Sequence, residues 1–318
     1  MKIILPGILA LGFCTAACAQ NWPEKPIRVL VGFAPGGTSD LSARLPSDIV
    51  SKEIGQTVVV ENRPGGSGSI AIEALMRSAA DGYTFVSGSD SSFYQPVINP
   101  QLPYRADKDL VPIAILVNQP IVIAVHPAPG WKSIKDMINA AKAHPGEVPY
   151  AISSPTGTQA LAGLLFFRLA KVKVIPVAYK GGGQAVIDLI SGQVPIAVLG
   201  SGPIVPQARA GRIKMLAVTS GKRSKALPEL PTLAELGYPE IDLVQWFGIM
   251  GKAGTPPDII NRLSLAYNKA LAEPTIAKRL FSVGAEPAGG TPEEMAVRMK
   301  AEMAVWTKAA NEAGMGKK

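Results

Sequence analysis

Short apolar runs alternate with helix-like patterns along most of the chain. Runs rich in β-branched residues predict strands, and apolar residues that recur every three or four positions predict helices. The predicted strands cover 27–33, 57–62, 83–89, 113–119, 121–127, 148–153, 174–179, 194–200, 213–220 and 245–251. The predicted helices cover 39–55, 67–80, 133–146, 158–170, 184–192, 203–211, 256–271 and 291–314. This alternation predicts an α/β fold with mostly parallel sheets.

Two local signals bear on the ends of these helices. Pro46 lies inside the first predicted helix, where it should kink the helix or mark a break. The last helix should begin at Thr291, which is followed by proline and two acids, a typical capped start.

One kind of unit recurs, in which a strand is followed by a small, glycine- or hydroxyl-rich loop and then a helix. It occurs at FAPGGTSD, NRPGGSGS, SSPTGTQ and YKGGGQ. In parallel sheets such loops lie at the carboxyl ends of the strands, where ligands bind. A helix start offers free N–H groups and a partial positive charge, and glycine allows close approach. The loops therefore predict a cradle for a carboxylate or a similar anion, and the missing Gly-Lys-Ser/Thr sequence argues against a nucleotide-binding P-loop.

Charged residues near these loops leave alternatives open. Asp40 directly follows the first loop; capping of the helix is favoured over holding of the loop. Arg63 and Lys180 lie in glycine-rich loops, where each either faces an anion or is simply solvated.

The first twenty residues differ from the rest. Lys2 precedes an apolar stretch, and Ala17-Cys18-Ala19 fits a cleavage site, so residues 1–19 are predicted to be a secretory signal peptide. A lipid anchor at Cys18 is the less favoured alternative. Both cysteines lie in this segment, so the mature chain should have neither a disulfide nor a thiolate site. No later segment reaches eighteen consecutive apolar residues, which predicts a soluble protein of the periplasm.

Composition narrows the function classes. The chain has 318 residues, 47% of them hydrophobic, enough for one or two packed domains. A formal charge of +8 without basic runs, together with only 6% aromatic residues, argues against nucleic-acid binding. The two histidines, His126 and His144, are expected to be structural. Catalytic serine, zinc-binding and Cys-x-x-Cys motifs are absent, so we expect neither an enzyme nor a metal or other cofactor.

Longer stretches resemble a known family. WPEKPIRVLVGFAPGGTSD is similar to the mature start of the tripartite tricarboxylate transporter receptors, the Bug or TctC-like periplasmic solute-binding proteins. VVVENRPGGSG, DGYTF, YKGGGQA, LISGQV, AGRIKMLAVTSGKRS, WFGIMGKAGTPP and EPAGGTPEE also look like recurring phrases of that family. The resemblance extends over essentially the whole mature chain.

The resemblance implies a two-lobed periplasmic-binding-protein fold that closes on a ligand, with two sheets joined by two hinge crossings. Lobe one would be residues 20–123 plus 246–318, and lobe two 124–245. The carboxylate would be held by backbone amides, hydroxyls and waters from strand-to-helix loops. The implied ligand-binding residues are Ala34, Pro35, Gly36, Gly37, Thr38, Ser39, Asp40, Ser89, Ser91, Ser92, Ser153, Ser154, Thr156, Gly157, Thr158, Tyr179, Lys180, Gly181 and Ser201.

The same resemblance implies a monomeric receptor that delivers an organic carboxylate to a membrane permease; a ligand-loaded sensor for a signalling partner is the alternative. Pro195 and Leu199-Gly200 replace acids and an asparagine common in the family, which favours a di- or tricarboxylate or an aromatic acid over an amino acid. Phe93 and Tyr94 could stack on an aromatic ligand, and packing in the core is the equal alternative.

Overall fold

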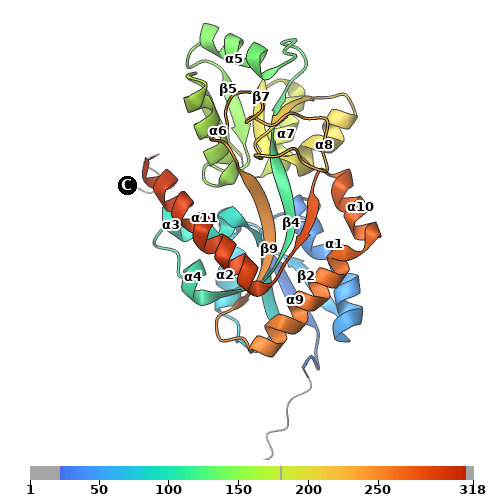
Figure 1. Ribbon diagram of the computed structural model, residues 1–318. Helices are drawn as coiled ribbons and strands as arrows, with labels where there is room; N and C mark the ends of the chain where they lie inside the picture. Colours follow the sequence, from blue (N-terminus) through green and yellow to red (C-terminus); the bar gives the residue numbers. More distant parts are fainter. Residues whose placement is uncertain (1–21, 180, 313–318) are drawn as a thin grey trace, which may run out of the picture.

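The computed structural model describes residues 22–179 and 181–312, which form two lobes stacked along two long strands (Figure 1). These strands are β4 (Leu110–Val125) and β9 (Val244–Lys252), paired antiparallel. The first predicted hinge crossing thus lies on β4 and the second on β9. The predicted signal peptide, both cysteines and Lys180 lie outside the described residues.

The lower lobe in Figure 1 contains the N-terminal strands and the C-terminal helices. Its strands are β1 (Ile27–Val31), β2 (Val58–Asn62), β3 (Thr84–Ser89) and β10 (Glu286–Gly289). Strand β1 is parallel to β2 and β3, and β3 is antiparallel to β9. The helices are α1 (Thr38–Ile54), a short 3₁₀ turn (Gly66–Gly68), α2 (Ser69–Met76), α3 (Asp90–Ile98), α4 (Ala106–Asp109), α9 (Pro257–Ala272), α10 (Pro274–Ser282) and α11 (Pro292–Glu312).

The upper lobe is formed by the middle of the chain and, like the lower lobe, consists of strands and helices. Its strands are β5 (Pro149–Ile152), β6 (Ile175–Ala178), β7 (Ile196–Gly200) and β8 (Lys214–Val218). Its helices are α5 (Ile134–Ala143), α6 (Thr158–Leu169), α7 (Gly182–Ser191) and α8 (Ser201–Arg209). Strand β5 is parallel to β6 and β7, whereas β7 and β8 are antiparallel to β4. Because β4 belongs to both sheets, the strand order β2-β1-β3-β9-β4-β7-β5-β6 is continuous.

Alternation of side chains along the strands gives each lobe a core on both faces of its sheet. On β1, Val29 and Val31 pack on the α1 and α9 side, while Leu30 packs on the α2 and α11 side. Within the upper lobe, Ile121 and Val122 of β4 likewise belong to separate cores. The sequence periodicity therefore predicted the α/β class correctly, and the two lobes agree with what the family resemblance implied. The sheets are mixed, because β4 and β9 are antiparallel to every strand with which they pair.

Several local predictions need correction. Helix α1 runs through Pro46 without a break, and the two strands predicted around Pro120 are one strand, β4, on which Pro120 pairs with Val244. Proline fits a strand where it need not donate a ladder hydrogen bond. Helices α3, α4 and α10 and strand β10 were not predicted. Helix α3 was missed because its serines and Pro96 are poor helix formers. Within residues 22–179 and 181–312, no helix has the length and apolarity needed to cross a membrane.

Candidate ligand-binding site

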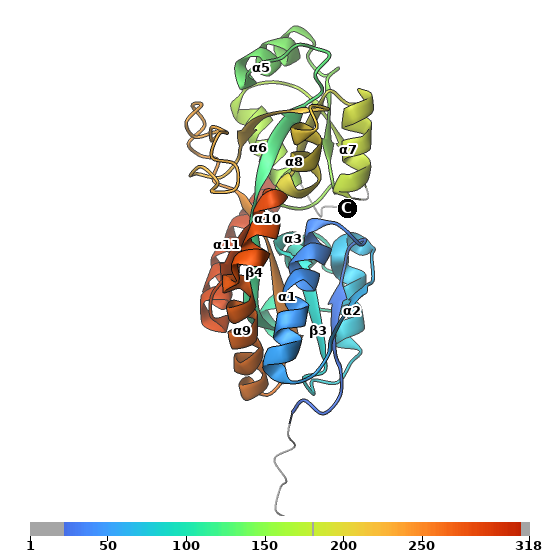
Figure 2. The same ribbon diagram turned by 90° about the vertical axis from the view of Figure 1, so that its right-hand side faces the viewer.

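Four of the helices that begin where the two lobes meet start after a glycine, and each follows the carboxyl end of a strand. Figure 2 shows the loops at the upper end of the lower lobe facing α7 and α8. The N-cap residue of each helix is a glycine without a side-chain capping bond, namely Gly37, Gly157, Gly181 and Gly200. Glycine cannot accept a hydrogen bond from the first turn, so N–H groups there are left for another partner. This arrangement suits a small anion.

The start of α1 is preceded by an exposed loop. Residues 34–37 are exposed, whereas Thr38 and Ser39 are buried. The Ser39 hydroxyl has no hydrogen-bond partner among the described residues. A buried hydroxyl without a partner is costly, and an anion at the helix start would accept its hydrogen bond.

Asp40 holds this loop from behind. Its carboxylate accepts hydrogen bonds from the Gly36 N–H at 3.1 Å, from Arg44 at 2.6 Å and from Asn62 at 2.9 Å. Asn62 also donates to the Phe33 carbonyl at 3.0 Å. Burial raises the pKa of Asp40, but these hydrogen bonds outweigh it and hold the pKa below its usual range. Asp40 therefore holds the loop in place. Of the two roles considered for it in the sequence, this is the less favoured one; the sequence favours capping of the helix.

The second predicted loop, 153–158, is bonded directly to the lower lobe. Ser154 and Ser67 hydroxyls lie 3.1 Å apart, and Gln95 Nε2 donates to Thr156 Oγ1 at 2.7 Å. Thr158 Oγ1 donates to Asp90 Oδ2 at 2.6 Å. The lobes are therefore in contact through this loop. Its direct partners lie on the 3₁₀ turn and α3, while the loop at 34–40 meets α8.

Asp90, which the sequence analysis did not select, lies at the centre of that contact. It is 2% exposed, and its other carboxylate oxygen accepts the Ser91 N–H at 2.6 Å. Burial raises the pKa of Asp90 to about 7; the hydrogen bond from Thr158 opposes the shift, and the charge of Glu302 adds to it. Its burial depends on both lobes, because Thr158 belongs to the upper one.

The serines expected to form a third binding loop are occupied with one another. The Ser89 hydroxyl lies 3.0 Å from the hydroxyls of both Ser91 and Ser92, and it caps α3 by accepting the Ser92 N–H. Ser92 Oγ donates to the Ser67 carbonyl at 2.8 Å. Ser89 and Ser92 are buried, so of the three only Ser91 retains partial exposure.

The remaining predicted residues of the upper lobe, Ser201, Tyr179 and Gly181, differ in what they contact. Ser201 is fully buried, and its hydroxyl donates to the Gly284 carbonyl of the lower lobe at 2.7 Å. The Tyr179 hydroxyl donates to Asp188 of α7 at 2.8 Å. Gly181 forms the start of α7. In the lower lobe, Arg63 lies 3.5 Å from Glu61, whose carboxylate also accepts two hydrogen bonds from Arg28. Ser201 thus joins the lobes, and Tyr179 is bonded within its own lobe.

A row of buried carboxamides connects the 153–158 loop with the two long strands. Ser153 Oγ donates to Gln159 Oε1 at 2.7 Å, and Gln159 Nε2 donates to Gln245 Oε1 at 3.0 Å. Gln119 Nε2 donates to the same Gln245 oxygen at 3.1 Å. These residues form a neutral, polar wall that was not predicted, because glutamines scattered over the sequence carry no recognisable motif.

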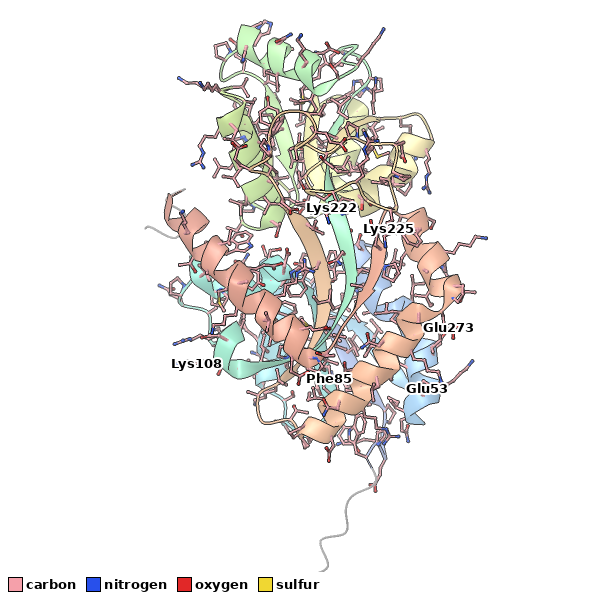
Figure 3. The ribbon with its side chains drawn as sticks, viewed as in Figure 1. Glu53, Phe85, Lys108, Lys222, Lys225 and Glu273 are labelled. Atoms are coloured by element: carbon pink, nitrogen blue, oxygen red, sulfur yellow. The ribbon has the colours of Figure 1, made fainter. Side chains whose placement is uncertain are left out.

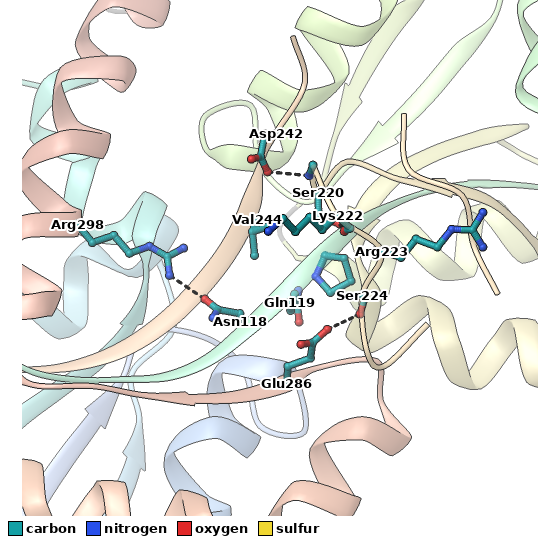
Figure 4. Close-up of a pocket in the computed structure, with 12 residues that line it drawn as sticks. Asn118, Gln119, Ser220, Lys222, Arg223, Ser224, Asp242, Val244, Glu286 and Arg298 are labelled. Carbon is teal, nitrogen blue, oxygen red and sulfur yellow. Dashed lines mark hydrogen bonds between the residues drawn. The ribbon is translucent and has the colours of Figure 1, made fainter. Parts of the chain in front are cut away.

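A cavity of about 330 Å³, separate from the helix starts, lies beside the middle of β4 and is shown in close-up in Figure 4. Among the residues that line this cavity, Arg298 donates a hydrogen bond to Asn118 Oδ1 at 2.9 Å, and Ser224 donates one to Glu286 Oε1 at 2.5 Å. Gln119 also lines the cavity. Figure 3 shows Lys222 and Lys225 near this point. The Ser224–Glu286 bond links the lobes on a side away from the helix starts.

The aromatic residues considered for ring stacking belong to the core. Phe93 is 0% and Tyr94 1% exposed, and Phe93 stacks on Trp246 with ring centroids 5.7 Å apart. The Tyr94 hydroxyl donates to Glu302 at 3.0 Å. Stacking of these two buried rings on a ligand is therefore excluded in this structure, and the core-packing alternative is correct.

The sequence matches the family described as the tripartite tricarboxylate transporter family receptor over residues 42–315. The chain belongs to this family. It is also 35% identical over 312 residues to the protein BugT of Bordetella pertussis, covering 96% of this chain and 95% of BugT. Family membership agrees with the resemblance found in the sequence, and it makes the chain a receptor and not an enzyme.

Solved structures agree with this assignment. The receptor superposes on R. palustris Rpa4515 with adipate with a TM-score of 0.87 and 33% identity, covering 92% of this chain and 99% of that one. It superposes on MatC (Rpa3494) from Rhodopseudomonas palustris with bound malate with a TM-score of 0.82 and 28% identity, covering 91% and 99%. Both neighbours hold a dicarboxylate.

The described part of the receptor contains no group of three or more histidine, cysteine or acidic residues able to hold a metal ion. At its lobe junction the start of α1 lies against α8, where a Cβ at Gly202 would be 2.0 Å from Thr38 Oγ1, and the start of α6 lies against α3, where a Cβ at Gly157 would be 3.1 Å from Ser91. The junction adds Asp90 and the carboxamide row, which the sequence did not indicate.

Proposed function

We propose that this receptor captures an organic carboxylate between its lobes outside the cytoplasm and delivers it to a membrane permease. The carrying observation is that the glycine-led start of α1 has no side-chain cap and lies against the glycine-led start of α8, with the buried Ser39 hydroxyl without a partner among the described residues. Such starts stabilise a carboxylate without a formal cation. Adipate and malate in the neighbouring structures support a ligand of this class.

The proposed contacts come from both lobes. The loop at 34–39 supplies N–H groups and hydroxyls, Asp40 holds that loop, and the start of α6 supplies N–H groups from the other side. Ser154, Thr156 and Thr158 join the lobes. We assign the bending points to Pro120 on β4 and Gln245 on β9, within a few residues of the limits predicted at 123 and 246.

The periplasmic location rests on the family and on the predicted signal peptide. Delivery to a permease of the tripartite tricarboxylate transporter type rests on the family alone. The lobe junction is complete within one chain, which supports action as a monomer.

The test is isothermal titration of the purified, ligand-stripped receptor. The panel contains succinate, malate, adipate, citrate, benzoate and, as a neutral control, glucose. We expect saturable binding of at least one carboxylate and none of glucose. A folded protein that binds no organic anion would contradict the proposal. Binding that persists after Ser39→Ala together with Gly37→Asp would show that the ligand occupies another site.

A further inference from the structure

Gln119 is the member of the carboxamide row with an unused acceptor. The residue is 2% exposed, and its Oε1 has no hydrogen-bond partner among the described residues. Its Nε2 is committed to Gln245, which fixes the orientation of the carboxamide. A buried carbonyl oxygen of this kind needs a donor, and leaving it without one costs free energy.

Two glycines show where that oxygen points. A Cβ at Gly200 would lie 1.7 Å from Gln119 Nε2, so the carboxamide fills the space of a side chain there. A Cβ at Gly202 would lie 3.6 Å from Gln119 Oε1 and 2.0 Å from Thr38 Oγ1. The unused oxygen is therefore beside the start of α1, where the proposed function puts the carboxylate. Gln119 also borders the separate cavity beside β4, but these contacts direct its carboxamide to the α1 side.

On the α1 side, the surroundings of Gln119 favour a neutral donor; the charged residues Lys222, Asp242, Glu286 and Arg298 line the cavity beside β4 instead. Gln159 and Gln245, which continue the row, carry no charge. Asp90 is buried with hydrogen bonds to both carboxylate oxygens, from Thr158 and Ser91. An ammonium group at Gln119 would lose hydration without gaining a carboxylate partner, which is unfavourable. A hydroxyl group supplies the missing hydrogen bond at no such cost.

We propose that Gln119 determines specificity by accepting a hydrogen bond from a hydroxyl group of the ligand; this inference rests on the proposed function. The substrate class is then a hydroxylated carboxylate. The ligand's carboxylate occupies the helix starts, and its hydroxyl reaches the neutral wall formed by Gln119, Gln245 and Gln159. A plain dicarboxylate would occupy the same helix starts but leave Gln119 Oε1 without a donor.

Succinate, malate and aspartate test this directly, because they differ only in hydrogen, hydroxyl or ammonium at one carbon. Adipate and 3-hydroxyadipate repeat the comparison on a longer frame. By titration calorimetry the wild-type receptor should bind the hydroxylated member of a series about tenfold more tightly than the plain member. Aspartate should bind more weakly than malate.

Gln119→Met keeps the side-chain length and removes the acceptor, so the preference for the hydroxyl should disappear while the plain acid still binds. Gly200→Ala should have the same effect by displacing the carboxamide, which provides a second route if Gln119→Met folds poorly. Gln207→Met is the matched control, since Gln207 Oε1 is also buried without a described partner but lies in the last turn of α8.

The outcomes separate the two proposals. Equal affinity for plain and hydroxylated acids, a preference for aspartate, or a hydroxyl preference that survives Gln119→Met would overturn the role of Gln119 and leave carboxylate capture intact. Loss of the preference in Gln207→Met as well would also overturn it. If the folded protein binds neither these acids nor any other organic anion, the proposed function itself is wrong.

Discussion

The starts of α1 and α3 lie at the same lobe junction but are built in opposite ways. Helix α3 carries its own anion, Asp90, and its own cap, Ser89, so its first N–H groups are bonded within the chain. Helix α1 begins at Gly37 with no side-chain cap, and its nearest acid, Asp40, turns back to the loop at Gly36. Helix starts attract negative charge in both cases. At α3 the receptor supplies its own carboxyl group, Asp90, which carries the charge only once the pH exceeds its raised pKa of about 7; at α1 we propose that the ligand supplies the charge.

The largest expected effect comes from making α1 resemble α3. Gly37 has φ of −79° and ψ of 170°, a conformation open to any residue, and a Cβ there would touch only the Ala34 carbonyl at 3.8 Å. Gly37→Asp should therefore fold and cap the helix. Its carboxylate should repel the ligand and lower carboxylate affinity by at least about 100-fold, as measured by titration calorimetry.

Gly37→Asn is the matched control for that change, because it caps the helix without adding charge. It should weaken binding less than Gly37→Asp, and both variants should melt at or above the wild-type temperature. Equal affinity in wild type and Gly37→Asp would place the carboxylate away from α1.

The second prediction concerns the charge that α3 supplies. The pKa of Asp90 is raised from 3.8 to about 7 in the folded protein, so between these values the folded state binds more protons than the unfolded state. The free energy of unfolding should then fall as pH rises from about 4 to 7, by at most about 1.4 kcal/mol per pH unit, and level off above pH 7. Arg298 and Glu302 of α11 also act on this group.

Asp90→Asn should remove that part of the slope in urea unfolding measured between pH 5 and 8. Asp48→Asn, at an exposed position of α1, serves as the control and should leave the slope unchanged. A slope that is the same in wild type and Asp90→Asn would mean that Asp90 is ionised throughout this range.

The smallest effects should come from the bonds that join loop 153–158 to α3. Thr158→Val removes a hydrogen bond to a buried acid, which should weaken lobe closure and reduce ligand affinity about tenfold. Thr156→Val removes a bond between neutral groups, from Gln95, and should cost only a few-fold. Titration of both variants with the same carboxylate should give this order. The reverse order would show that Asp90 does not strengthen the contact.

The sequence predicted what depends on local pattern. The alternation of apolar residues indicated the strands, and glycines before a helix pattern indicated the starts at Gly37 and Gly157. The Asp90–Thr158 contact could not be predicted in this way, because it joins residues 68 positions apart that meet only when the lobes are packed together. Phe93 was ambiguous for the same reason: an apolar residue after a binding loop has no sequence feature that separates core from cleft.

Strand β4 belongs to both sheets, and this limits how the receptor can move. A protein whose halves are joined by a flexible linker swings freely, whereas here opening must bend or twist β4, which pairs with β9 up to Pro120 and with β7 and β8 from Ile121 onward. A strand that is hydrogen-bonded to neighbours in both lobes resists such bending. Neither half retains a complete sheet without the other, so cutting the chain at Pro120 should unfold both halves instead of yielding two separate domains.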